Sequence, residues 1–145
     1  CSCCGSSRSG RGPMADHGVN TGFGRVLIAI YAVFALAASA RSAYQLATQW
    51  STAPLAYLLS ALAAVIYIVA TIALAAGTPR SQRVATIAII IELCGVLIVG
   101  TLSLVDPSLF PRATVWSGFG RGYGFIPLVL PVVGLWWIWR HRASR

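Results

Sequence analysis

The sequence has few charged residues and no lysine. Only 10% of its 145 residues are charged, whereas soluble domains carry about 25%. A soluble fold with so few charged side chains would have too little polar surface to cover itself. Because 57% of the residues are hydrophobic, the composition favours a chain that folds in a lipid bilayer. The length allows one compact unit.

The sequence also lacks the groupings of reactive residues that mark common enzyme sites. No nucleophile with a nearby base and no phosphate-binding loop is found, and the two histidines lie in polar tails, at His17 and His141. The cysteines near the N-terminus are fewer than the four ligands of a closed metal site: Cys1, Cys3 and Cys4. A lone cysteine in an apolar run, such as Cys94, usually behaves as a small hydrophobic residue. We therefore expect a protein that is not an enzyme and that has no metal and no cofactor.

Four apolar runs approach the length of a membrane span, which is about 20 residues. They predict transmembrane helices at approximately 25–48, 54–77, 84–105 and 122–139. The fourth run is shorter and contains Pro127 and Pro131. The predicted fold is an all-α membrane protein in which residues 21–145 form a single bundle of four transmembrane helices.

The first twenty residues read differently from the rest. Residues 1–20 are polar, rich in glycine and serine and without periodicity, which is typical of a disordered tail. Met14 begins an ordinary N-terminal sequence, so residues 1–13 are interpreted as not native. An alternative is a signal peptide cleaved after Ala40, which would leave three spans. The helical pattern continues beyond this site, which favours an intact first span.

Arginines mark the ends of the apolar runs. If all four runs cross, one side receives Arg8, Arg11, Arg25, Arg80, Arg83, Arg140, Arg142 and Arg145, and the other receives Arg41, Arg112 and Arg121. Cytoplasmic loops carry an excess of basic residues, so both termini are predicted in the cytoplasm and the protein in the cytoplasmic membrane. Tryptophan prefers the headgroup level, so Trp50 and Trp116 are expected at the outer surface. The arginines form no stripe with interleaved aromatics, so the net charge of +8 does not indicate nucleic acid.

The third apolar run contains a carboxylate, Glu92. A charge inside a membrane is costly and usually pairs or faces a cavity. Residues three and four apart share a helix face, which places Glu92 on a stripe of small residues where another helix approaches closely. That stripe comprises Ala85, Ala88, Gly95 and Val99, and matching stripes are Ala32, Ala35, Ser39 and Ser42 in the first span and Ala56, Ser60 and Ala64 in the second.

Two kinds of partner are open for Glu92. Arg41 lies about 10 Å away along the helix axes, so it either leans towards the carboxylate or extends to the outer face. Without a cation, the candidate partners are the hydroxyl groups of Ser60, Tyr67 and Thr71. The carboxyl group then acts as a clasp between helices or as the proton-exchanging group of a transporter. Transporters usually show a relay of several ionisable groups, so a single glutamate favours the clasp.

The segment between the third and fourth runs begins at Asp106 and is rich in glycine. Glycines alternate with larger residues from Gly118 to Gly124, including Gly120, Arg121 and Gly122. Alternate glycines permit close backbone approach and unusual dihedral angles. The loop either folds back over the bundle as a lid, with Arg121 pointing inward, or lies on the surface beside a kinked helix.

Residues 25–139 resemble a group of uncharacterised small four-span membrane proteins of high-GC Gram-positive bacteria. The resemblance is carried by RSAYQLAT, APLAYLLSALAAVIYIVAT, ELCGVLIVGTLSLVDPSLFP and TVWSGFGRGYGFIPLVLPVVGLWW. It implies four spans in the cytoplasmic membrane and directs attention to Arg41, Glu92, Asp106 and residues 116–124, without assigning an activity. We expect an accessory or interaction protein whose partners are the bilayer and a second copy or another membrane protein. The alternative is a small oligomeric proton-linked transporter or channel that uses Glu92 and Arg41.

Overall fold

The computed structural model describes residues 15–143, with side chains for residues 22–143. In this part of the chain every regular element is a helix, and no strand occurs. The elements are α1 (Ala15–Thr48), α2 (Pro54–Ala76), α3 (Pro79–Val105), the 3-10 helices η1 (Pro107–Leu109) and η2 (Ser117–Tyr123), and α4 (Ile126–Ala143). The predicted all-α class is confirmed.

Three helical segments are long and apolar enough to cross a membrane: Gly22–Thr48, Pro54–Ala76 and Pro79–Val105. The fourth predicted span is broken. The η2 and α4 helices qualify only as a pair, and their axes differ by 97°. The break falls at Gly124 and Phe125, whose φ angles are +64° and +61°. The described chain therefore has three spanning helices and a bent fourth element.

Local sequence signals set the ends of α2 and α3. Proline occupies the first turn of both helices, where its missing N–H would have no intrahelical partner. The α2 helix ends at Gly77, which adopts a left-handed conformation with φ +65°, as is common after a helix. Thr78 and Ser81 then form a capping box, with bonds of 3.1 and 2.9 Å between side chain and backbone. The α2–α3 connection is thus short and well defined.

The α1 helix begins earlier than predicted. The predicted disordered tail comprised residues 1–20, but residues 15–20 belong to α1. Helix elongation adds a hydrogen bond for each residue that joins, so the helix extends from the apolar run into this polar segment. Residues 1–14 lie outside the described part, and with them the interpretation of Met14 and of the first three cysteines.

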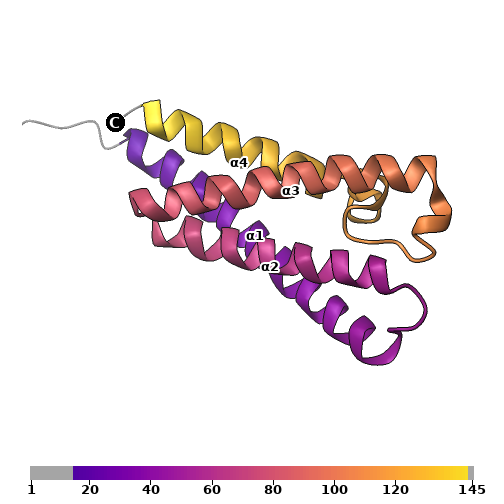
Figure 1. Ribbon diagram of the computed structural model, residues 1–145. Helices are drawn as coiled ribbons and strands as arrows, with labels where there is room; N and C mark the ends of the chain where they lie inside the picture. Colours follow the sequence, from indigo (N-terminus) through magenta and orange to yellow (C-terminus); the bar gives the residue numbers. More distant parts are fainter. Residues whose placement is uncertain (1–14, 144–145) are drawn as a thin grey trace, which may run out of the picture.

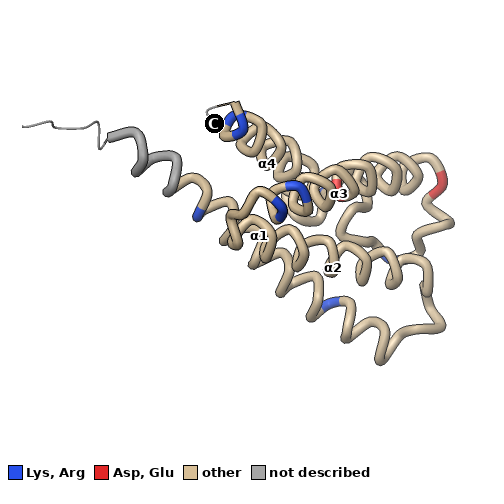
Figure 2. Tube along the Cα trace, turned by 60° about the vertical axis from the view of Figure 1, so that its left-hand side comes forward, with Lys and Arg blue, Asp and Glu red and all other residues tan. Residues whose placement is uncertain are grey.

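The helices run alternately up and down, so α1 begins and α4 ends at the same end of the molecule (Figure 1). Figure 2 shows basic positions gathered at this end, which we call the arginine end. It carries Arg25, Arg80, Arg83, Arg140 and Arg142. The α1 helix packs mainly on α2, α2 on α3, and α3 on both α4 and η2. The bundle is therefore a row of neighbouring helices with its edge elements, α1 and α4, in looser contact.

Small residues face the interior as predicted for the second and third spans. Ala56, Ser60 and Ala64 are buried in α2, and Ala85, Ala88, Glu92 and Val99 in α3. In α1 the buried face is offset from the prediction. Ala35 and Ser42 are buried, but Ala32 and Ser39 are only half-buried. The buried face is centred on the larger residues Leu27, Tyr31 and Phe34 and continues to Ala38.

The segment after α3 folds back along α3 and does not leave the bundle (Figure 1, orange). Two glycines of α3 make this possible. A Cβ atom added at Gly95 would lie 2.8 Å from the Trp116 ring, and one at Gly100 would lie 2.6 Å from the Phe119 ring and 2.9 Å from its backbone nitrogen. The loop thus docks on α3 where that helix has no side chains.

We predict that Gly100→Val destabilises the protein by about 1–3 kcal/mol, because a bulky side chain cannot fit against the Phe119 backbone. The measurement is thermal unfolding in detergent, followed by tryptophan fluorescence. Gly122→Val is the matched control, since a Cβ atom at Gly122 meets nothing within 4 Å. Equal loss of stability in the two variants would contradict this packing.

Candidate functional site

Glu92 lies at the centre of α3 and is fully buried, with 0% of its side chain exposed. Its neighbours on this face are the small residues Ala85 and Ala88 and the β-branched Val96 and Val99, all buried. A carboxyl group at this depth must be accommodated by hydrogen bonds, because lipid offers none. The predicted placement of Glu92 towards other helices, and away from lipid, is confirmed.

The partner of Glu92 is a tyrosine of the first span. The Tyr31 hydroxyl donates a hydrogen bond of 3.0 Å to Glu92 Oε2, and both residues are buried. The Tyr31 ring centroid lies 6.2 Å from that of Tyr67 on α2, and Phe34 lies 5.7 Å from Tyr67. Aromatic side chains from α1 and α2 therefore enclose the carboxyl group.

Three buried polar atoms at this site have no hydrogen-bond partner among the described residues: Glu92 Oε1, Tyr67 Oη and Trp116 Nε1. Tyr67 lies near enough to interact with both Glu92 and Trp116, although neither pair meets the geometry of a hydrogen bond. Tyr31, Tyr67, Glu92 and Trp116 thus form one group, here called the Glu92 cluster. The group combines one carboxyl with two hydroxyls and an indole N–H, contributed by α1, α2, α3 and the loop before η2.

Trp116 does not lie at the outer surface, as its position in the sequence suggested. Only 2% of it is exposed, and its ring contacts α3 at Gly95, one helical turn from Glu92. The reason is the turn that precedes it. The Thr114 side chain accepts hydrogen bonds from the backbone nitrogens of Trp116 and Ser117, at 3.2 and 3.0 Å, and this turn directs the indole inward.

Arg41 does not pair with Glu92 but holds the same loop. Its guanidinium donates bonds of 2.8 Å to the Tyr123 hydroxyl and 3.0 Å to the Ala113 carbonyl, and it lies 6.0 Å from the centre of the Tyr123 ring. Ala113 precedes Trp116 in the sequence and Tyr123 follows it, so Arg41 binds the loop on both sides of this tryptophan. Arg41 therefore extends towards the end of the bundle opposite the arginine end and ties the loop to α1.

The remaining loop candidates have structural positions. Asp106 is exposed and caps η1 by accepting bonds from the backbone and hydroxyl groups of Ser108. Gly120 is buried with φ +78°, and a Cβ atom there would lie 2.7 Å from Pro127. Arg121 is exposed, so the expectation that it points inward is wrong. With Gly122 it lines an open cleft of about 520 Å³ at the end of the bundle opposite the arginine end.

The loop folds back over the bundle, as one of the two alternatives predicted, but its buried hydrophobic residues are Val115 and Trp116, and the half-buried Phe119 packs on α3 at Gly100. The left-handed backbone at Gly118, Phe119 and Gly120 turns the chain so that it continues into α4. The Gly118 nitrogen also donates a bond of 2.8 Å to the Ser103 hydroxyl on α3. The loop is thus bonded to both α1 and α3.

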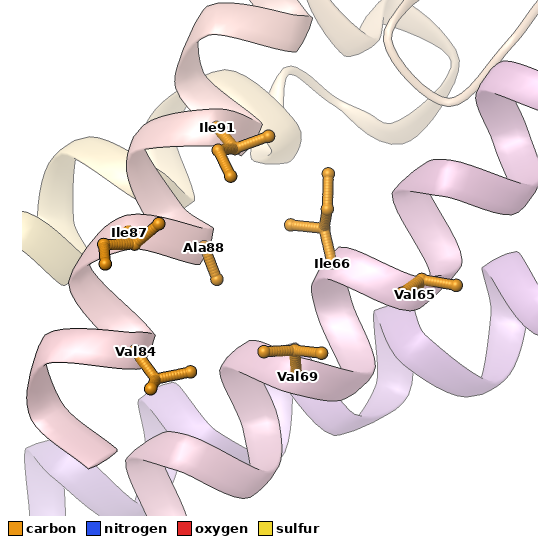
Figure 3. Close-up of a pocket in the computed structure, with 7 residues that line it drawn as sticks. All are labelled: Val65, Ile66, Val69, Val84, Ile87, Ala88 and Ile91. Carbon is orange, nitrogen blue, oxygen red and sulfur yellow. The ribbon is translucent and has the colours of Figure 1, made fainter. Parts of the chain in front are cut away.

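Access to Glu92 from the lipid side is limited. Figure 3 shows seven apolar side chains that line a groove between α2 and α3. The groove has a volume of about 220 Å³. A second groove lies between α1 and α4 and is also wholly apolar. Neither groove is lined by a residue of the Glu92 cluster.

No group of three or more potential metal ligands occurs within the described residues. Cys94 is exposed on α3, and His141 contacts the carbonyl oxygen and the ring of Trp137 at the end of α4. Comparison of the chain with family models, with curated proteins and with solved structures finds no match. Inferences about function therefore depend on the geometry of this chain.

The sequence reasoning missed Tyr31 as the partner of Glu92, although a signal was present. Leu27, Tyr31, Phe34 and Ala38 follow three- and four-residue spacing, which places the tyrosine on a helix face. Of the hydroxyls proposed instead, Tyr67 belongs to the cluster without a hydrogen bond. Thr71 donates to the Tyr67 carbonyl in its own helix, and Ser60 is buried without a partner among the described residues.

We predict that Tyr31→Phe lowers stability by about 1–2 kcal/mol, because Glu92 loses the donor to its buried oxygen. Thermal unfolding in detergent measures the change. Tyr44→Phe is the control, since Tyr44 lies on the same helix but is exposed. Unchanged unfolding of the Tyr31 variant would show that the bond contributes nothing.

We predict that Arg41→Gln loosens the loop without unfolding the helices, because both bonds from the guanidinium to the loop are lost. Hydrogen–deuterium exchange should rise across residues 113–123 and stay unchanged in α2. Arg121→Gln is a control of equal charge from an exposed position. If the two variants exchange alike, Arg41 does not hold the loop.

Proposed function

We propose that the chain is a multi-pass accessory protein of the cytoplasmic membrane that acts through contacts of its helices within the bilayer, without catalysis. Its arginine end is proposed to face the cytoplasm, since basic residues are retained there. The resemblance to small four-span proteins of high-GC Gram-positive bacteria is part of this proposal. The α1–α2 and α2–α3 connections are short and the longer α3–α4 segment folds back on α3, so the surface available to a partner is mainly the apolar side of the bundle.

The observation that carries the proposal is the complete burial of Glu92 with a hydrogen bond to Tyr31. A carboxyl that moves protons must meet water or a chain of ionisable groups. Within residues 22–143 the other acidic side chain is Asp106, at the outer end of α3, so no acidic relay leads to Glu92. The arrangement fits a polar clasp that fixes how α1 and α3 meet.

A proton-linked transporter is the second candidate, and one observation favours it. Polar atoms of Glu92, Tyr67 and Trp116 are buried without partners beneath a loop that Arg41 secures. If the loop moved outward, Trp116 would leave the cluster and these atoms would face the outer aqueous side. The same geometry would then act as a gate.

Proton flux separates the two candidates. We expect liposomes that contain the wild-type protein and a pH-sensitive dye to leak protons no faster than protein-free vesicles.

Glu92→Gln should unfold like the wild type because its amide oxygen still accepts from Tyr31. Glu92→Leu should lose about 1–3 kcal/mol, because the buried Tyr31 hydroxyl loses its acceptor.

The opposite result would establish transport: flux in the wild type that disappears in Glu92→Gln and persists in the control Asp106→Asn.

The accessory role is tested by a second experiment. A membrane protein partner, or a second copy of this chain, should remain bound at fixed stoichiometry through two purification steps in mild detergent.

A further inference from the structure

The second apolar groove lies between α1 and α4, where the two helices are held apart. The α1 helix packs mainly on α2, and α4 on α3. The groove has two adjoining parts of about 290 and 350 Å³, both lined entirely by apolar side chains. Its walls are Val26, Ala29, Ile30 and Val33 on α1 and Ile126, Val129, Leu130 and Val133 on α4.

Aromatic residues lie at the arginine end of the groove. Phe23 lines it and meets Trp136 edge to face, with ring centroids 6.4 Å apart. The guanidinium of Arg140 lies over the Trp136 ring, 5.2 Å from its centre. Val129, Val133, Trp136 and Arg140 follow four-, three- and four-residue spacing, so they share one face of α4. The apolar wall of α4 therefore leads directly to a cation.

The wall formed by α1 ends in the same way. Arg25 precedes Ala29 by four residues and Val33 by eight, so it continues their stripe, and it is exposed. Within residues 22–143 the acidic side chains are Glu92, at mid-helix, and Asp106, at the opposite end. No carboxylate of this part neutralises Arg25 or Arg140. The groove thus has an arginine from each wall at one end.

We propose that this groove binds an anionic phospholipid, with an acyl chain between α1 and α4 and the phosphate group between Arg25 and Arg140. The apolar lining matches the acyl chain and the two cations match the anionic headgroup, as in basic pockets between membrane helices. Arginine suits this role because its planar donors match phosphate geometry. The proposal requires a membrane setting but not the accessory role proposed above.

The test is native mass spectrometry of the full-length protein in detergent, titrated with phosphatidylglycerol or with phosphatidylcholine of the same acyl chains. We expect one phosphatidylglycerol to bind in preference to phosphatidylcholine. Each arginine near a membrane surface contributes about 1 kcal/mol, or roughly fivefold. The double variant R25Q/R140Q should therefore lower the preference by roughly 25-fold.

The chain offers a matched control for the charge. R80Q/R83Q removes the same charge from the same end, beside the α2–α3 groove of Figure 3, and should keep the preference. A substitution within the groove tests the acyl-chain site. Ala29→Phe should fill the groove and abolish retention of the lipid. Ala37→Phe, at another exposed position of α1, should leave retention of the lipid unchanged.

Three results would overturn the proposal. Equal retention of the two lipids would remove the role of the headgroup. Equal loss of preference in the two double variants would reduce the effect to net charge. A lipid-free dimer that Ala29→Phe dissociates would assign the groove to a second copy of this chain. The first two results are independent of proton flux and of protein partners, so they leave the accessory role untouched, whereas the dimer would support that role while it overturns the lipid site.

Discussion

The carboxyl group of Glu92, held at the middle of a membrane helix, is the constraint on which the rest of the bundle depends. Apolar helices gain little from meeting one another in lipid, because lipid tails are as apolar as leucine. Their register must come from close packing and from polar contacts. The bond from Tyr31 to Glu92 joins α1 to α3, although α1 packs mainly on α2. It links helices that are not neighbours in the row, so a shift of any one of the three would break it.

The irregular loop depends on the same helices. Backbone that is not helical is tolerated at membrane depth only where protein buries it or water reaches it. Here Trp116 is buried against α3 at Gly95, and Arg41 of α1 binds the loop on both sides of that residue. The α1 helix therefore supplies both the donor to the carboxyl and the cation that secures the loop above it. Movement of α1 would release both contacts at once.

The sequence was sufficient to predict the helices and the depth of Glu92, because apolar run length and three- and four-residue spacing report them directly. It did not predict which residue meets Glu92 or where Trp116 lies. Tyr31 belongs to a face whose larger residues displaced the predicted stripe by one position, and Ala32 and Ser39 became half-buried. The inward turn at Trp116 follows from bonds to the Thr114 side chain and from an open site at Gly95. The preference of tryptophan for headgroups carries no information about such local contacts.

The short apolar part of α4 accounts for two features of the protein: the loop that packs on α3 and the open groove between α1 and α4. Residues 126–139 span about 21 Å as a helix, whereas the hydrocarbon core is about 30 Å thick. At the end opposite the arginine end, the loop with Trp116 and Phe119 supplies the missing length. This loop packs on α3 together with α4. Because both the loop and α4 are fixed to α3, α4 meets α1 at points such as Gly24 and Tyr31 without packing closely along it, and the apolar groove between them stays open. The carboxyl group of Glu92 is thereby buried inside the bundle, while the groove between α1 and α4 stays open at the surface.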